Sequence, residues 1–167
     1  MRISVECLSK RFHADVLTLD DADRILSFCR TNPEFYRLCH MECSPEQIRR
    51  DLTVTPPGKP IEDKYFFGFY DDGALIALMD LILGYPSAET AFIGLFMVHG
   101  PERNRGIGSG LITEVCDALR ELGFSSVRLG IHRNNTPAKH FWAKNNFLVL
   151  REVAWDEAPI LLAERRL

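Results

Sequence analysis

A glycine-rich segment carries the clearest chemical signal in the chain. The stretch VHGPERNRGIGSGLI, residues 98–112, has glycines at alternate positions from Gly106 to Gly110, preceded by Arg103 and Arg105. Apolar residues at helical spacing follow, so the N–H groups and positive dipole of a helix start lie beside two guanidinium groups. Glycine also lets a ligand approach the backbone closely. The segment therefore predicts a site for a polyanion.

Two common nucleotide-binding loops do not fit this segment. A Walker A loop needs a lysine after its last glycine, and none follows Gly106 or Gly108. A Rossmann loop needs the spacing G-x-G-x-x-G after a strand that opens a βαβ unit. Here the spacing is G-x-G-x-G, and the preceding strand closes an antiparallel region. A plain glycine-rich turn with solvated arginines is the structural alternative.

A carboxylate inside an apolar strand is the second candidate. Asp80 lies in the segment ALIALMDLIL, residues 74–83. Its side chain faces either a substrate cleft or an exposed strand edge, and the sequence leaves both alternatives open. If the side chain is buried beside apolar neighbours, its pKa rises towards the range useful for a general base.

Other polar residues near these segments have a functional and a structural interpretation. Tyr85, in the turn GYP, either lines a substrate cleft or packs within the turn. His99 either relays a proton beside the glycine-rich loop or is a solvated loop residue. His132 and His140 are expected at a strand end and on a helix surface.

The cysteines indicate a reducing compartment. The chain has five, an odd number without paired close spacing, which favours reduced thiols and a cytoplasmic location. The segment CHMEC, residues 39–43, resembles half of a zinc site, but no second pair of ligands follows at matching spacing. We therefore predict no metal.

Composition restricts the class of protein. The 167 residues are 46% hydrophobic and 26% charged, as in one ordinary globular domain. A net charge of −3 argues against a nucleic-acid partner. No apolar run approaches the roughly 18 to 20 residues that span a bilayer, so no membrane partner is expected.

The element pattern is that of an α/β protein. Helices are predicted within residues 20–30 and 44–52, before a Pro/Gly-rich loop. Residues 64–70 and 74–83 form an antiparallel hairpin through the Asp72-Gly73 turn. A strand over 90–98, a helix ending at Gly123 and a strand over 127–131 form a parallel crossover unit. A last helix starts near Asn135, and residues 159–167 form a final strand.

Two motifs resemble those of the GNAT family of N-acetyltransferases. Arg103-x-x-Gly106-x-Gly108 fits the family's Arg/Gln-x-x-Gly-x-Gly/Ala, with Val98 five positions upstream. The segment IHRNNTPAKHFWAKNNF fits the pattern V-x3-N-x2-A-x2-L-Y-x2-G-F through Ile131, Asn135, Ala138, Phe141, Trp142 and Phe147. The two motifs together are specific, and the resemblance covers roughly residues 64–166.

The resemblance implies the GNAT acyl-CoA N-acyltransferase fold. This is a mixed central sheet of about six to seven strands with helices on both faces. Residues 1–167 are then one N-acetyltransferase domain, in which residues 1–60 give a strand and the helical acceptor side. Residues 64–147 give the acyl-CoA-binding core, and residues 148–167 the C-terminal strands. A homodimer through those strands is compatible with the family.

The resemblance also implies acetyl-CoA as co-substrate. The backbones of Phe96, Met97 and Val98 would pair with the pantetheine arm. The thioester end and the arm would lie near Asn135, Phe141 and Trp142. The pyrophosphate would be held by a loop of seven residues: Arg103, Asn104, Arg105, Gly106, Ile107, Gly108 and Ser109.

The implied reaction is direct acetyl transfer to the primary amine of a small molecule or peptide. A backbone N–H near Val98 would stabilise the oxyanion. Trp142 stands where many members have an acidic tyrosine, and Phe92 where some have a glutamate base, so Asp80 is the candidate base. Tyr36 and Tyr85 are candidate acceptor residues, with structural roles left open. The negative net charge favours a cationic acceptor.

Two other classes stay open at the level of sequence. The missing tyrosine and glutamate suit a non-catalytic acetyl-CoA-binding sensor, which would bind the cofactor without turnover. A plain interaction domain would not bind coenzyme A. Release of free thiol that depends on the acceptor separates an enzyme from both.

Overall fold

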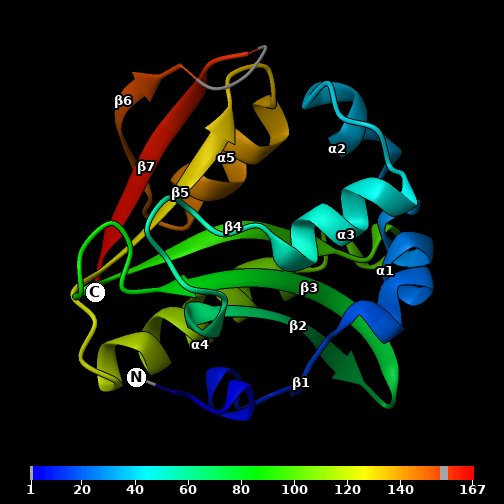
Figure 1. Cartoon of the computed structure of the whole chain (residues 1–167), viewed down its shortest axis with the longest axis horizontal. Helices are drawn as coiled ribbons and strands as arrows, with labels where there is room; N and C mark the ends of the chain where they lie inside the picture. The colour runs from blue at the N-terminus through cyan, green and yellow to red at the C-terminus, as the bar shows by residue number, and fades with distance from the viewer. Residues whose placement is uncertain (1, 155–157) are drawn as a thin grey trace.

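A mixed seven-stranded sheet forms the centre of the computed structural model, which describes residues 2–154 and 158–167. The strand order is β1-β2-β3-β4-β5-β7-β6 (Figure 1). The strands are β1 (His13–Val16), β2 (Lys64–Asp71), β3 (Ala74–Leu83), β4 (Thr90–Val98), β5 (Ser126–His132), β6 (Leu148–Val153) and β7 (Ile160–Arg166).

Helices lie on both faces of the sheet, as the resemblance implied. The α-helices are α1 (Ala22–Cys29), α2 (Pro33–Leu38), α3 (Pro45–Thr53), α4 (Ile107–Glu121) and α5 (Thr136–Lys144). Short 3-10 turns are η1 (Val5–Leu8), η2 (Leu19–Asp21), η3 (Ile61–Asp63) and η4 (Gly100–Glu102). No helix in the described ranges is long and apolar enough to cross a membrane.

Alternation along the strands divides the apolar residues between two cores. Phe67 and Met79 pack with α4 and α5 in the larger core, whereas Phe66 and Leu78 pack with α1 and α3 on the other face. Successive side chains of a strand point to opposite faces, so each long apolar strand serves both cores. Asp80 lies on the same face as Leu78, which is the face that α1 and α3 cover.

Local sequence signals set the boundaries of several elements. Asp72 and Gly73 have φ values of 45° and 81°, as a two-residue hairpin turn requires. Ser44 caps α3 by accepting a hydrogen bond from the Gln47 N–H at 3.2 Å. Gly123 follows α4 with a φ of 91°. Helix α2 begins with a proline and was not predicted as a separate element.

The parallel pair β4–β5 is short and then splits. Pairing runs from Thr90 to Ile93 on β4 and stops there. Asp80 of β3 is opposite Leu95 and the next residue of β3 is opposite Ile93, so Gly94 is an extra residue in β4. Such a bulge bends its strand. The two strands therefore splay apart after Ile93, and the second half of β4 has a free edge on the side of β5.

Candidate active site

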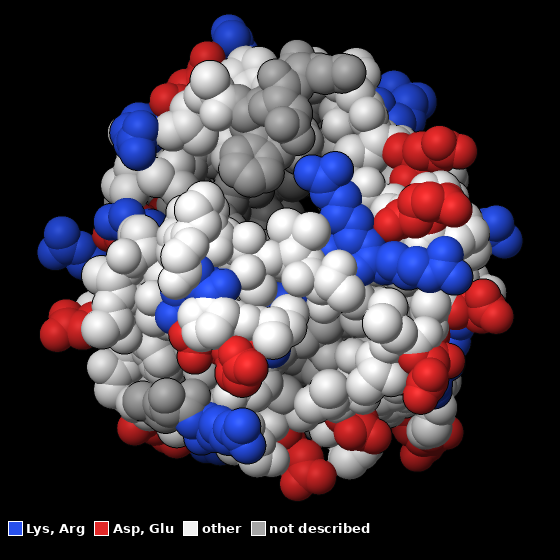
Figure 2. Space-filling view, viewed as in Figure 1, with Lys and Arg blue, Asp and Glu red and all other residues white. Residues whose placement is uncertain are grey.

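A cleft of about 1700 Å³ lies where β4 and β5 separate. Its walls come from β3, β4, β5, the loop before α4, helix α5 and the α2–α3 region. Figure 2 shows a hollow on this face of the molecule, with a basic side chain at its rim. The candidate residues can therefore be described by which wall of the cleft they form.

The glycine-rich loop ends in a helix start that opens onto the cleft. Gly106 adopts a left-handed conformation with a φ of 80° and precedes the first turn of α4. The first intrahelical bond runs from the Gly110 N–H to the Gly106 carbonyl at 3.0 Å, so the N–H groups of residues 107–109 precede it. A Cβ on Gly108 would lie 3.1 Å from the Phe141 ring, so a side chain there would require that ring to shift. This geometry suits an anion.

The two arginines of the loop have different surroundings. Arg103 lines the cleft together with Asn104, whose φ is 62°. Arg105 instead forms an ion pair with Glu102, has a side chain that is 65% exposed, and is not among the described residues that line the cleft. The expectation that both guanidinium groups point at one anion is not met. Ile107 contributes only its backbone, because its side chain is in the core.

The register of β4 determines which backbone groups face the gap. The His99 N–H donates to the Ile76 carbonyl of β3 at 2.8 Å, which makes Val98 and Ala77 a non-hydrogen-bonded pair. The backbone groups of Val98 and Phe96 therefore point away from β3, towards the gap. Those of Met97 point to β3 and are used there, contrary to the expectation that all three residues pair with a ligand.

A buried asparagine connects the helical region to this strand. The Asn32 amide donates to the Val98 carbonyl at 3.0 Å, and the side chain is 3% exposed. Next to it, the Gly100 N–H donates to the Thr31 hydroxyl at 2.9 Å. The Val98 carbonyl is thus engaged, while its N–H still faces the gap. Asn32 fixes the end of β4 beside the glycine-rich loop.

Aromatic rings form the wall between the gap and α5. The ring of Phe96 stacks on Phe141 at 6.0 Å between centroids, and Phe141 meets Trp142 edge-on at 5.0 Å. Trp142 is 8% exposed and also contacts Phe147. Asn135 caps α5 by accepting from the Ala138 N–H at 3.1 Å. The second motif thus builds a rigid apolar wall with a capped helix.

Asp80 lies on the floor of the cleft and not at a sheet edge. It is 7% exposed on the interior strand β3, and its Oδ2 accepts a hydrogen bond from the Lys64 ammonium at 2.7 Å. Its Oδ1 is buried and has no hydrogen-bond partner among the described residues. The carboxylate lies directly over Gly94, where a Cβ would overlap Oδ2. Of the two alternatives, the structure supports the cleft.

Burial perturbs two carboxyl groups at this end of the cleft. It raises the pKa of Asp80 to about 6, although the Lys64 ammonium opposes the shift. It also raises the pKa of Asp51 to about 6, against the Gln47 hydrogen bond and Lys64. Asp51 belongs to α3, and its Oδ1 accepts from the Gln47 amide at 2.7 Å. Perturbed carboxyl groups in a cleft are candidates for acid–base and binding roles.

The remaining candidates are divided between the cleft and the core. Tyr85 lines the cleft and meets Phe92 edge-on at 5.5 Å. Tyr36 is 4% exposed in the smaller core and is not among the described cleft-lining residues, which argues against contact with a ligand. His132 and His140 line the cleft, and burial lowers the pKa of His132.

His99 packs against an aromatic ring and does not line the cleft. Its ring lies 5.5 Å from that of Phe28, and it is outside the described cleft lining. No group of three or more His, Cys, Asp or Glu residues in the described ranges is arranged to hold a metal ion.

Sequence reasoning missed four residues of the site. Asn32, Asp51, Lys64 and Gly94 all line the cleft. Lys64 begins the strand that forms a hairpin with the strand of Asp80, so the sequence could have predicted that the two charged residues lie near each other. Gly94 interrupts an apolar strand, and an isolated glycine there indicates a bulge. Asn32 and Asp51 have no local signal, because their partners are distant in the sequence.

The split strand pair and the helix start at its end define a site for an extended ligand with an anionic end. A family model described as the Acetyltransferase (GNAT) family matches residues 25–147, which is more than half of the chain. The protein therefore belongs to the GNAT acetyltransferase family. No curated protein sequence matches the chain.

Solved structures confirm the fold. An acetyltransferase from Thermus thermophilus has a TM-score of 0.75 at 23% identity, over 93% of this chain and 97% of that chain. Ard1 from Thermoplasma volcanium has a TM-score of 0.68 at 20% identity, over 94% and 98%. A PaiA N-acetyltransferase from Thermoplasma acidophilum in complex with coenzyme A has 0.67 at 20%, over 93% and 99%.

Proposed function

We propose that this protein is an N-acetyltransferase that transfers an acetyl group from acetyl-CoA directly to a primary amine of a small molecule or peptide. One observation carries the proposal: a single cleft joins an anion-binding helix start, a free strand edge and a buried carboxylate. A long anionic carrier needs the first two groups, and an amine acceptor needs the third. Residues 1–167 then act as one domain, and the five free cysteines favour the cytoplasm.

The groups in the cleft fit acetyl-CoA. The N–H groups at the start of α4 and the Arg103 guanidinium would hold the pyrophosphate. The backbone of Phe96 would pair with the pantetheine arm as an added strand does, beside the Val98 N–H that faces the same gap. The rings of Phe141 and Trp142 would exclude water on one side of the arm. The likeness to a structure that contains coenzyme A supports this assignment.

The chemistry needs a neutral amine beside the thioester. The Asp80 carboxylate takes one proton from the bound ammonium, which leaves a neutral amine. The amine nitrogen attacks the acetyl carbon, and the N–H of Val98 donates to the oxygen that becomes negative. The C–N bond forms, the C–S bond breaks, and the second nitrogen proton leaves to the thiolate through water. Trp142 cannot act as the acid, because its indole N–H does not ionise near neutral pH.

A ligand panel followed by a turnover assay tests the proposal. Acetyl-CoA at about a hundred times its Kd should stabilise the fold by roughly 2.7 kcal/mol, a thermal shift of several degrees, whereas NADH should not. The matched variants are Arg103→Ala in the loop and Arg120→Ala at the far end of α4. A tenfold loss of affinity at the same concentration leaves about 1.4 kcal/mol, so a shift that falls to about half in the first variant alone supports the assignment, and an equal shift with NADH contradicts it.

Thiol release with a panel of primary amines then separates an enzyme from a sensor. An acetyltransferase releases coenzyme A in proportion to the acetylated amine. The sensor alternative is favoured by the absence of the family's tyrosine and glutamate, at Trp142 and Phe92. A protein that binds acetyl-CoA and releases no thiol with any amine would be that sensor.

A further inference from the structure

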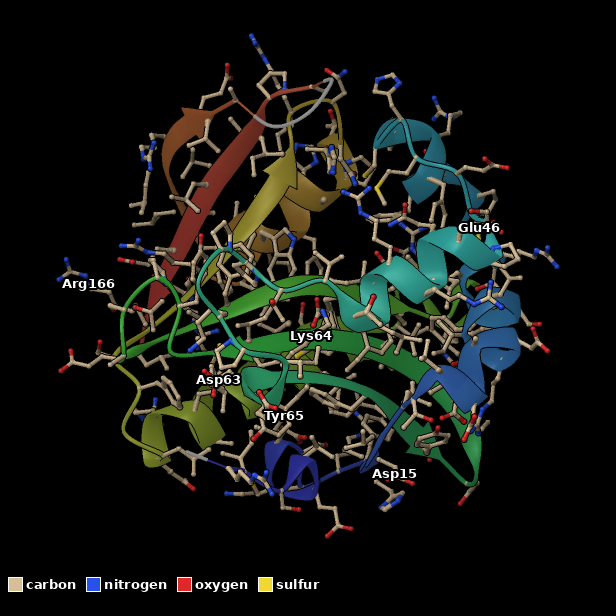
Figure 3. The ribbon with its side chains drawn as sticks, viewed as in Figure 1. Asp15, Glu46, Asp63, Lys64, Tyr65 and Arg166 are labelled. Carbon is tan, nitrogen blue, oxygen red and sulfur yellow. The ribbon has the colours of Figure 1, made fainter. Side chains whose placement is uncertain are left out.

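Three charged side chains from three elements lie close enough to interact electrostatically at one end of the cleft. Lys64 begins β2, Asp80 lies in β3 and Asp51 lies in α3, and all three line the cleft. Figure 3 labels Lys64 near the centre of the molecule and Glu46 at the start of α3, away from it. The face of α3 that carries Gln47 and Asp51 is the one that turns to the cleft.

The hydrogen bonds at this end leave one acceptor atom buried and unused. The Lys64 ammonium, whose side chain is 3% exposed, donates to Oδ2 of Asp80, and Gln47 donates to Oδ1 of Asp51. Oδ1 of Asp80 has no partner in the described part of the chain. A buried carboxylate oxygen without a donor is costly, so a ligand that brings a donor is favoured there.

The charges at this end do not balance. Two carboxylates face one buried ammonium, which leaves a net charge of −1 when both carboxylates are ionised. Arg50 of α3 also lines the cleft and acts on Asp51, but its side chain is exposed, so solvent and salt screen its charge more than that of Lys64. One added cation would pair both carboxylates with ammonium groups. Buried charges are stable only when they are paired in this way.

We propose that Asp51 and Asp80 form a cation subsite that takes the acceptor as a protonated primary amine, with Lys64 as the residue that positions Asp80. The inference rests on the proposed function and specifies its substrate class. Asp51 binds the ammonium by charge and hydrogen bonding. Asp80 then removes the proton, while Lys64 holds its other oxygen in place over Gly94. Acceptors whose amine is flanked by a carboxylate are disfavoured, because that carboxylate would meet Asp51.

A direct binding measurement tests the subsite without turnover. Calorimetric titration of the full chain at neutral pH uses n-butylamine as the cation and n-butanol as its neutral isostere. The wild type should bind n-butylamine more tightly than n-butanol. Asp51→Asn should lose about tenfold or more of the n-butylamine affinity, because a hydrogen bond to a charged group is removed. Glu46→Gln, with the same change of charge on the same helix, should bind like the wild type.

Equal binding of the amine and the alcohol, or equal amine binding by the wild type and Asp51→Asn, would overturn the subsite. Thermal unfolding of each variant checks that it folds. Where an amine is acetylated, Asp51→Asn should raise its KM more than it lowers kcat, and a loss confined to kcat would also overturn the proposal. Failure of acetyl-CoA to bind would count against the proposed function instead, because the amine titration contains no acetyl-CoA.

Discussion

The two sides of the cleft present different kinds of group to their ligands. On the side of β4 and the loop before α4, the groups are backbone N–H groups on a free strand edge and at a helix start. On the floor, they are the side chains of Asp80, Lys64 and Asp51, which come from three elements. Under the proposed function, backbone groups would recognise a carrier that is the same in every reaction, whereas the side chains could be exchanged to suit an acceptor.

The two sides of the cleft also differ in what they cost the stability of the fold. The carrier side costs little to form, because helix starts and strand edges have free N–H groups wherever they occur. The floor holds charges that burial penalises, and the ion pair between Lys64 and Asp80 and the hydrogen bond from Gln47 to Asp51 offset part of the penalty. Substitutions on the floor should therefore affect both catalysis and folding, and substitutions of the loop should affect mainly binding of the carrier.

Removal of the Asp80 carboxylate is the strongest test of the floor. We expect Asp80→Asn to lower kcat by about 100-fold to 10,000-fold, which is what a general base contributes. Affinity for acetyl-CoA should be unchanged, since Asp80 is not in the phosphate-binding loop. Steady-state thiol release and a calorimetric titration with acetyl-CoA measure the two effects. A variant with normal kcat would remove Asp80 from the mechanism.

The pH dependence distinguishes a base on the floor from a purely structural ion pair. Burial raises the pKa of Asp80 and of Asp51 to about 6 each. The ionised carboxylate is the active form, so kcat/KM should be level above that pKa and fall by about tenfold per unit as the pH drops below it. This acidic limb of the pH profile reflects the coupled titration of Asp51 and Asp80 and not the pKa of one residue.

The variants Asp51→Asn and Asp80→Asn show which carboxyl group causes the acidic limb of the pH profile. Asp51→Asn should move it to lower pH, because the negative charge of Asp51 raises the pKa of Asp80. Rate profiles over the acidic range for the wild type and both variants provide the measurement. A limb that persists unchanged in Asp80→Asn would assign the titration to another group.

The loop arginines test the carrier side. Arg103→Ala should weaken coenzyme A binding by about tenfold, the effect of losing a hydrogen bond to a charged group. Arg105→Ala should bind nearly as well as the wild type, because Arg105 is exposed and paired with Glu102. Calorimetry with coenzyme A at low and high salt makes the comparison. Equal losses in the two variants would show that Arg105 leaves Glu102 when the ligand binds.

Asn32 connects the segment before α2 to the end of β4, and its substitution should have the smallest effect. Asn32→Ala removes a buried hydrogen bond to the Val98 carbonyl, which should lower the free energy of unfolding by about 1–3 kcal/mol. The KM for acetyl-CoA should rise a few-fold, because the end of β4 is less firmly held. Denaturant unfolding and steady-state kinetics measure both, with the exposed Asn134→Ala as control. A loss of stability without any change in KM would make Asn32 purely structural.

The carrier side could be predicted from the sequence because its signals are local. Glycines, arginines and the helical pattern of residues 103–119 are contiguous, and the Asp72-Gly73 turn specified the hairpin. What the pattern could not show is that Arg105 has a partner one turn back. It also could not show that the backbone of Met97 faces β3, since that depends on register.

The floor was less predictable because it depends on a break in the β2–β3 register. A hairpin continued without a break would set Asp80 opposite Tyr65, and Lys64 would point to the other face. The register shift sets Asp80 opposite Phe66 instead, two residues from Lys64 and on the same face. Asp51 reaches the floor from a helix whose placement depends on packing. Burial of Asp80 could be foreseen, but its partners could not.

Gly94 has a consequence for how this protein can change. The same residue follows the last β4 residue paired with β5 and makes room for the Asp80 carboxylate, so a side chain there would require the carboxylate to move away from its place beside Lys64. A substitution at this position would therefore change both the strand edge proposed to bind the carrier and the position of the proposed base. A library with all amino acids at position 94, selected for acetyl transfer, should return glycine, whereas Asp51 can vary as the acceptor changes.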